Sequence, residues 1–158
     1  KKCPINNFCY ALKKGNPEVY PVKNKLKPIP YFNVVIAIIW RKDKFYIQKR
    51  STDQMLGGLW EFPGGIVNQG QDSELFLKQK VYEECGVQIK IFKKVGFVDH
   101  AFSHFKIRLN CYFCTEKKHF LDENETRKWI SKKNIKNYSF PKANHKLFKK
   151  LELNNWYA

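Results

Sequence analysis

The sequence lacks the features that would direct it to a membrane or out of the cell. It contains no apolar run of about 20 residues, the length that a membrane-spanning helix needs. Its first residues, Lys1-Lys2-Cys3-Pro4, include no apolar stretch of the signal-peptide type. Its five cysteines are an odd number without the paired spacing of a secreted disulfide scaffold. We therefore expect a soluble protein with no membrane partner, in a reducing compartment.

Acidic residues are also scarce. Fourteen Asp and Glu stand against thirty Lys and Arg, so the formal net charge is +16 for 158 residues. Such a charge attracts polyanions, and nucleic acid is the first partner to consider. The alternative is a generic solvated basic surface.

Four segments follow one another along the chain. Residues 1–14 form a short segment with two cysteines, and residues 15–30 contain Gly15 and four prolines among lysines, which cannot hold a regular helix or a central strand. This second segment is predicted to be a linker. Residues 31–152 are predicted to form the main domain, and residues 153–158 a tail.

The main domain alternates strand patterns with two helices. Strands are predicted at 32–40, 44–50, 88–98 and 105–115, with a short one at 129–130. A glycine-rich loop leads to a helix from about Glu74 to Cys85, which Asp72-Ser73 would cap and Gly86 would end. Pro141 is predicted to open a last helix that runs through Leu151. This order indicates an α+β sandwich.

The central helix carries a pair of glutamates. At 100° per residue, Leu77, Val81 and Cys85 fall on one side and would pack on the sheet. The other side is predicted to carry Phe76, Gln79, Lys80 and Glu83, and Glu84 lies between the two sides. Carboxylates at positions 80, 83 and 84 would converge on a hard cation such as Mg²⁺, but position 80 is a lysine.

These residues belong to a longer pattern, Gly65-x5-Gln71-x7-Gln79-Lys80-Val81-x-Glu83-Glu84-x-Gly86-Val87. It resembles the Nudix box, G-x5-E-x7-R-E-U-x-E-E-x-G-U with U aliphatic. The resemblance implies a Nudix-like α/β/α sandwich with a mixed β-sheet. Three functional positions of the family are replaced, by Gln71, Gln79 and Lys80, so we expect weak or absent hydrolysis. The Glu pair then serves either as a residual Mg²⁺ site or as a solvated helix face.

Flanking motifs resemble one branch more closely. They are Leu59-Trp60-Glu61-Phe62-Pro63, His100-Ala101-Phe102-Ser103-His104-Phe105 and Asn137-Tyr138-Ser139-Phe140-Pro141. They are similar to the C-terminal domain of MutY-type adenine DNA glycosylases over most of residues 31–151. In that family the domain recognises 8-oxoguanine mispaired with adenine, on the face of the duplex opposite the glycosylase domain. The resemblance implies double-stranded DNA as partner, contact with an upstream glycosylase domain, a monomer, and a bacterial cytoplasmic location with the nucleoid.

Cys3 and Cys9 fit the same resemblance. Cys3-x5-Cys9 followed by Tyr20-Pro21-Val22-Lys23 is similar to the last two ligands of the family's [4Fe-4S] cluster and the linker after them. We therefore expect the chain to be part of a longer protein that holds the cluster and the catalytic residues. The isolated domain would hold no cluster, because two thiolates do not make a four-cysteine site. By themselves the two cysteines would be ordinary thiols.

The resemblance makes Phe102-Ser103-His104 the loop that inspects the oxidised base. 8-Oxoguanine carries a proton at N7, so a hydroxyl that accepts from N7–H discriminates it from guanine, and Ser103 is the candidate. Phe102 would anchor the loop, and His104 or His100 would brace it or touch phosphate. The alternative puts Phe102 in the core and the histidines at strand ends. Four basic residues near this loop or the glycine-rich loop are candidate phosphate contacts: Lys49, Arg50, Lys106 and Arg108.

Cys111 and Cys114 are not expected to form a zinc half-site, because residues three apart in a strand point to opposite faces.

Two main functions remain. The first is recognition of 8-oxoguanine in 8-oxoguanine:adenine mispairs as part of an adenine DNA glycosylase, with no catalytic residue in this chain. The alternative is a Mg²⁺-dependent Nudix pyrophosphohydrolase acting on oxidised nucleotides such as 8-oxo-dGTP. A nonspecific basic binder is a third.

Overall fold

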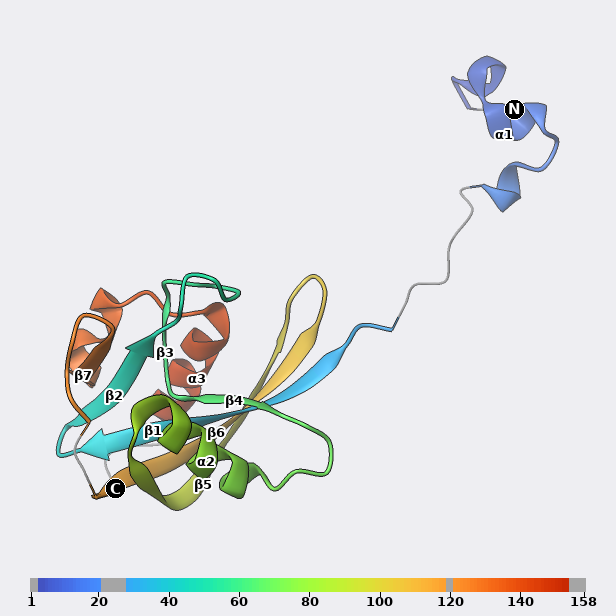
Figure 1. Cartoon of the computed structure of the whole chain (residues 1–158). Coiled ribbons are helices and arrows are strands. Elements are labelled where there is room, and N and C mark those ends of the chain that lie inside the picture. Colours follow the sequence, from blue (N-terminus) through green and yellow to red (C-terminus); the bar gives the residue numbers. More distant parts are fainter. Residues whose placement is uncertain (1–2, 21–27, 119–120, 154–158) are drawn as a thin grey trace.

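The computed structural model describes residues 3–20, 28–118 and 121–153 of the chain. The amino-terminal segment holds single turns, and the main domain holds seven strands and two longer helices among the described residues (Figure 1). In chain order the elements are η1 (Asn6–Phe8), α1 (Tyr10–Lys13), η2 (Pro17–Val19), β1 (Tyr31–Arg41), β2 (Lys44–Lys49), β3 (Trp60–Glu61), β4 (Gly64–Val67), α2 (Ser73–Cys85), β5 (Gln88–Ala101), β6 (Lys106–Lys118), β7 (Arg127–Ser131), η3 (Lys132–Asn137) and α3 (Lys142–Leu153).

Strand β1 organises the sheet. It runs parallel to β6 from Tyr31 to Ile39 and antiparallel to β4, and at its end it turns into β2. The tight turn uses Lys42 at φ 57°, which is the left-handed conformation of a hairpin turn. The mixed sheet that the family resemblance implied is thus present, as is the predicted strand pair.

The continuous apolar run of β1 is explained by burial on both faces. Val35, Ala37 and Ile39 belong to one core cluster, and Ile36 and Ile38 to the other. A strand whose two faces are both covered needs no polar alternation. This strand therefore divides the core into two halves.

One helix covers each half. Leu77 and Val81 of α2 are fully buried in the first cluster, and Leu147 and Leu151 of α3 are buried in the second. The result is a helix–sheet–helix sandwich, with α2 and α3 against different faces of the sheet (Figure 1). The predicted α+β sandwich is confirmed.

The ends of α2 are where the sequence predicts them. Asp72 caps the first turn by accepting a hydrogen bond from the Leu75 N–H at 2.7 Å. Gly86 ends the helix at φ 74°, and its N–H donates to the Tyr82 carbonyl. The opposite-face assignment of Phe76 was wrong: Phe76 is half-buried and packs against the first core cluster, because Gly65 of β4 runs beside that side of the helix.

Other boundaries needed correction. The glycine-rich segment is not only a loop, since it contributes the short strands β3 and β4. Strands β5 and β6 extend to Ala101 and Lys118, three residues beyond each predicted end, and β7 and α3 are also slightly longer than predicted. Residues 21–27 of the expected linker and 154–158 of the expected tail lie outside the described residues. Within the described ranges, no helix combines the length and apolar character needed to span a bilayer.

Candidate functional site

Gly64 of the glycine-rich segment has no room for a side chain. Gly64 lies opposite Ile36 in the β1–β4 ladder with φ 156°, and a Cβ added to it would lie 2.0 Å from the Val35 carbonyl oxygen. At Gly65 an added Cβ would lie 3.4 Å from both Lys80 Cε and the Phe76 ring. The segment therefore lies directly against α2, and the Lys80 stem reaches it.

Glu83 and Glu84 of α2 each have a partner among the residues that depart from the family pattern, and Glu84 has a further partner on β2. Lys80 Nζ lies 3.1 Å from one carboxylate oxygen of Glu84, and Gln48 Nε2 donates to the other oxygen at 2.9 Å. Gln79 Nε2 donates to Glu83 Oε1 at 3.0 Å. The ammonium and amide groups thus take the positions around the carboxylates that a cation would need.

The third departure acts on the loop. Gln71 Oε1 accepts a hydrogen bond from the Asn68 N–H at 2.9 Å, just before α2 begins. Its amide therefore closes the turn that leads from β4 into the helix. A loop-closing role of this kind needs no negative charge.

The described residues do not fit the Mg²⁺ of the hydrolytic Nudix enzymes. A hard divalent cation takes several oxygen ligands, often carboxylates. Within residues 3–20, 28–118 and 121–153, no group of three His, Cys, Asp or Glu side chains is arranged to hold a metal ion. Lys80 adds a positive charge beside Glu84. The expectation of weak or absent hydrolysis stays a prediction.

Two residues that the sequence did not single out complete this polar cluster. Glu61 of β3 pairs with Arg50, and Gln48 bridges toward Glu84. Burial raises the pKa of Glu61, and the charge of Glu84 adds to that rise, whereas Arg50 and Gln48 act in the opposite direction. Gln48 and Glu84 are 36 residues apart. The hydrogen bond between Gln48 and Glu84 is therefore seen only in the folded structure, where β2 lies beside α2.

The Phe102-Ser103-His104 segment forms the turn between the long strands β5 and β6 (Figure 1). The turn closes with a hydrogen bond of 2.8 Å from the Phe102 N–H to the Phe105 carbonyl. Ser103 and His104 are exposed, and Phe102 is half-buried. The Phe102 ring stacks on Phe105 with centroids 4.6 Å apart. Phe102 thus anchors the turn locally rather than in the main core, and it leaves the Ser103 side chain in solvent.

His100 braces the same turn from β5. Its ring meets Phe102 edge-on at 4.6 Å, and its Nδ1 is buried with no hydrogen-bond partner in the described part of the chain. Desolvation lowers the pKa of His100, and the nearby positive charges of Lys146 and Lys142 lower it further. The neutral imidazole is therefore favoured.

The four candidate phosphate contacts fall into two pairs. Lys106 is exposed at the start of β6, and Arg108 forms two hydrogen bonds of 2.9 Å with Asp99 on β5. Lys49 and Arg50 lie at the end of β2 beside the glycine-rich segment. Lys49 is exposed, whereas Arg50 pairs with Glu61 and donates to the Met55 carbonyl. Of the four, the two lysines present ammonium groups at exposed positions.

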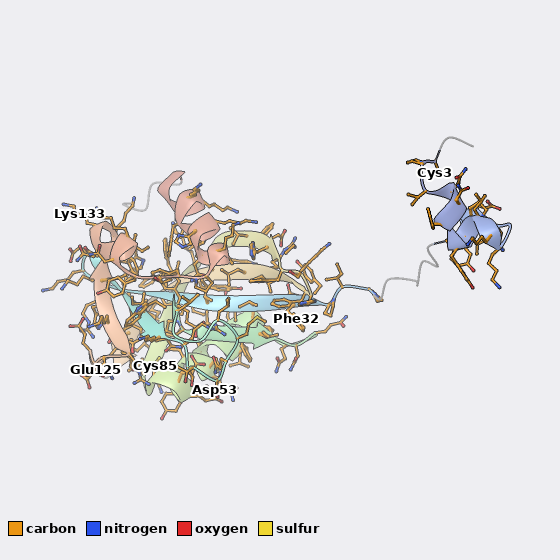
Figure 2. All side chains as sticks on the ribbon, turned by 90° about the horizontal axis from the view of Figure 1, so that it is seen from above. Cys3, Phe32, Asp53, Cys85, Glu125 and Lys133 are labelled. Atoms are coloured by element: carbon orange, nitrogen blue, oxygen red, sulfur yellow. The ribbon has the colours of Figure 1, made fainter. Side chains whose placement is uncertain are left out.

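All five cysteines are free thiols. Cys3, which is labelled in Figure 2, is exposed in the amino-terminal segment. Cys9 of the same segment is half-buried. Cys111 and Cys114 are buried in different core clusters, on opposite faces of β6 as predicted, and burial raises the pKa of each thiol to about 12. These two cannot share a metal ion. The cluster role of Cys3 and Cys9 stays a prediction.

Comparison with known proteins gives two kinds of relative. The 8-oxo-dGTP diphosphatase of Buchnera aphidicola subsp. Schizaphis graminum is 32% identical over 124 residues, which are 77% of this chain and 94% of that protein. The adenine DNA glycosylase of Buchnera aphidicola subsp. Acyrthosiphon pisum is 25% identical over 159 residues, which cover 96% of this chain but only 42% of the glycosylase. The identity is thus higher to the diphosphatase, and this chain spans less than half the length of the glycosylase.

Solved structures agree on the fold. The MutT protein of Methanosarcina mazei Go1 superposes with a TM-score of 0.71 at 21% identity, over 83% of this chain and 99% of that protein. A family model for the NUDIX domain matches residues 34–150, which run from β1 into α3. With the sandwich, the α2 motif and this match, the chain belongs to the NUDIX domain family.

Proposed function

We propose that this NUDIX domain recognises 8-oxoguanine in 8-oxoguanine:adenine mispairs of duplex DNA, as the C-terminal part of an adenine DNA glycosylase. The observation that carries the proposal is the ion pair of Lys80 with Glu84, at 3.1 Å, in the motif where hydrolytic relatives place a metal-binding carboxylate. A domain of this kind keeps the shape of the fold for binding rather than for pyrophosphate chemistry.

The state of the glutamates supports recognition without hydrolysis. Metal-assisted attack of water on a pyrophosphate needs a cation held by free carboxylate oxygens. Glu84 has Lys80 and Gln48 on its two oxygens, and Glu83 is hydrogen-bonded to Gln79. Binding a cation there would require displacing an ammonium and breaking these hydrogen bonds.

The β5–β6 turn supports a role in reading the base. Its Ser103 hydroxyl is exposed, and the stacked Phe102 and Phe105 rings below it limit the freedom of the turn. N7 of guanine is an acceptor, whereas N7–H of 8-oxoguanine is a donor. A hydroxyl is able to accept from that donor, so Ser103 Oγ has the chemistry to favour the oxidised base.

The coverage of the relatives supports the DNA context. The match to the glycosylase spans 96% of this chain, and the match to the diphosphatase spans 77%. A protein resembling only the diphosphatase would leave the amino-terminal segment with Cys3 and Cys9 unaccounted for. We propose that this chain is part of a longer protein, which holds the [4Fe-4S] cluster and the catalytic domain and binds the DNA.

The test is a binding assay with the 158-residue chain. We expect tighter binding to a duplex with 8-oxoguanine opposite adenine than to the matching guanine:adenine duplex. Ser103→Ala should reduce that preference about 5- to 10-fold, the effect of one net hydrogen bond of about 1 kcal/mol or slightly more. Ser131→Ala, at the end of β7, is the control. Equal affinities of Ser103→Ala and wild type for both duplexes would overturn the role of the turn.

The second candidate is a diphosphatase acting on 8-oxo-dGTP, favoured by the 32% identity over nearly the whole length of such an enzyme. It predicts Mg²⁺-dependent release of pyrophosphate from 8-oxo-dGTP by the same chain. Glu83→Gln serves as the control for turnover by this site. Robust turnover that depends on Glu83 would establish the hydrolase and refute the non-hydrolytic reading.

A further inference from the structure

Helix α3 carries a row of lysines beside the face that packs on the sheet, and two of them contact β5. Lys142, Lys146 and Lys150 recur every four residues, so they share one face of the helix. The adjacent face of α3 buries Leu147 and Leu151 against the sheet. Lys142 and Lys146 are exposed, and Lys150 is half-buried. At 1.5 Å per residue the row is about 12 Å long, with about 6 Å between successive lysines. We call Lys142, Lys146 and Lys150 the α3 lysine row.

Strand β5 holds two of the three lysines in place. Lys146 Nζ donates to the Asp99 carbonyl at 3.1 Å, and Lys150 Nζ donates to the Phe97 carbonyl at 2.7 Å. The Lys150 ammonium also lies 5.0 Å from the centre of the Phe97 ring. A lysine ammonium has three N–H donors, so each retains donors for another acceptor after these bonds. Lys146 and Lys150 are therefore ordered before any ligand binds, which lowers the entropy lost on binding.

The row leads toward the β5–β6 turn. Lys142 and Lys146 lie close enough to His100 for their charges to act on its imidazole, and the His100 ring contacts Phe102 of the turn. Asp99, the carboxylate beside the row, is paired with Arg108. That pairing reduces the repulsion that an approaching anion would meet.

We propose that the α3 lysine row binds backbone phosphates of the DNA duplex while the Phe102-Ser103-His104 turn reads the base. The inference rests on the proposed recognition function and extends it to a second surface. Duplex DNA carries one phosphate per about 3.4 Å of each strand, so a row of about 12 Å spans about three phosphates.

The experiment measures binding of the 158-residue chain to both duplexes at several salt concentrations. The row variant is Lys142→Gln/Lys146→Gln/Lys150→Gln, in which each glutamine keeps a donor. The control is Lys78→Gln/Lys133→Gln/Lys136→Gln, with the same change of charge on exposed positions of α2 and η3. Figure 2 shows Lys133 at the end of the domain away from Phe32, which lies beside Phe105 near the turn.

Each phosphate contact contributes about 0.9 to the slope of log K against log salt. The row variant should lower that slope by about 2 to 3, equally for the 8-oxoguanine and the guanine duplex, with the preference for 8-oxoguanine retained. The control should keep the wild-type slope. If the row variant does not melt cooperatively, Lys142→Gln alone should lower the slope by about 0.9.

The outcomes separate the two proposals. Equal slopes for the row variant, the control and wild type would overturn the α3 lysine row but leave base recognition standing. Equal losses in the row variant and the control would also overturn it, because charge alone would then explain binding. Weakened binding of 8-oxo-dGTP with unchanged DNA binding would assign the row to a nucleotide instead. Wild type that binds neither duplex would refute both proposals.

Discussion

Replacing Lys80 by glutamate should convert the α2 motif from an ion pair into a cation site. The ion pair between Lys80 and Glu84 is an i, i+4 pair whose side chains are 33% and 27% exposed. Such pairs contribute about 0.3–0.5 kcal/mol, and a like-charge pair at the same spacing costs a similar amount. Lys80→Glu should therefore lower stability by about 0.6–1 kcal/mol without metal, which is about 2–3 °C in Tm for a domain of this size.

Magnesium should reverse that loss. With position 80 acidic, three carboxylates lie at positions 80, 83 and 84, the arrangement that suits a hard cation. A ligand at ten times its Kd stabilises the folded state by about 1.4 kcal/mol, which exceeds the predicted loss. In thermal unfolding, Lys80→Glu should melt below wild type in EDTA and at or above it in saturating Mg²⁺.

Two comparisons decide the matter. Lys80→Gln removes the ammonium without adding a carboxylate, so its Tm should not respond to Mg²⁺ more than the Tm of wild type does. Wild type should be insensitive to Mg²⁺ within error. A rise in Tm of wild type as large as that of Lys80→Glu would refute the argument that the ammonium keeps a cation from Glu83 and Glu84.

Three further substitutions test the fold around the α2 motif and around the β5–β6 strand pair. Gly64→Ala should destabilise the domain by more than about 3 kcal/mol in urea unfolding, because the added methyl would lie 2.0 Å from the Val35 carbonyl oxygen. Asp72→Ala should cost about 1 kcal/mol by removing the cap of α2, seen as a lower Tm. The hydrogen bond from Arg108 lowers the pKa of Asp99, so Arg108→Gln should raise that pKa in an NMR titration. The pKa of Asp99 is lowered in the folded state, so wild type should be more stable than Arg108→Gln at neutral pH. This difference in stability should vanish as the pH falls through the folded-state pKa of Asp99.

Local signals in the sequence were sufficient for most elements. Asp72 and Gly86 mark the two ends of α2 as predicted, because capping depends on residues within one turn of the helix end. The spacing of Cys111 and Cys114 predicted opposite faces because the side-chain period of a strand is two, and the two core clusters confirm it. Predictions of this kind require only the geometry of one element.

The errors arose where distant segments meet. Phe76 was assigned to the outer face from helix periodicity, but β4 passes beside it and half-buries the ring. The contact of Gln48 with Glu84 depends on how β2 packs against α2, which no local pattern contains. The same holds for Lys146 and Lys150, whose carbonyl partners on β5 lie 47 and 53 residues away. Sequence reasoning therefore found the motif residues and missed their partners.

The structure also changes what the match to the Nudix motif implies. Gly64 is required by the close approach of Val35, whether or not a metal is bound. Glu84 is held by Lys80 and Gln48, and its backbone carbonyl accepts a hydrogen bond of 2.7 Å from Arg127, so it links α2 to β2 and β7. Packing accounts for Gly64, the residue just before the motif, and hydrogen bonding and ion pairing account for Glu84 of the motif. The presence of Gly64 and Glu84 therefore does not by itself indicate hydrolysis.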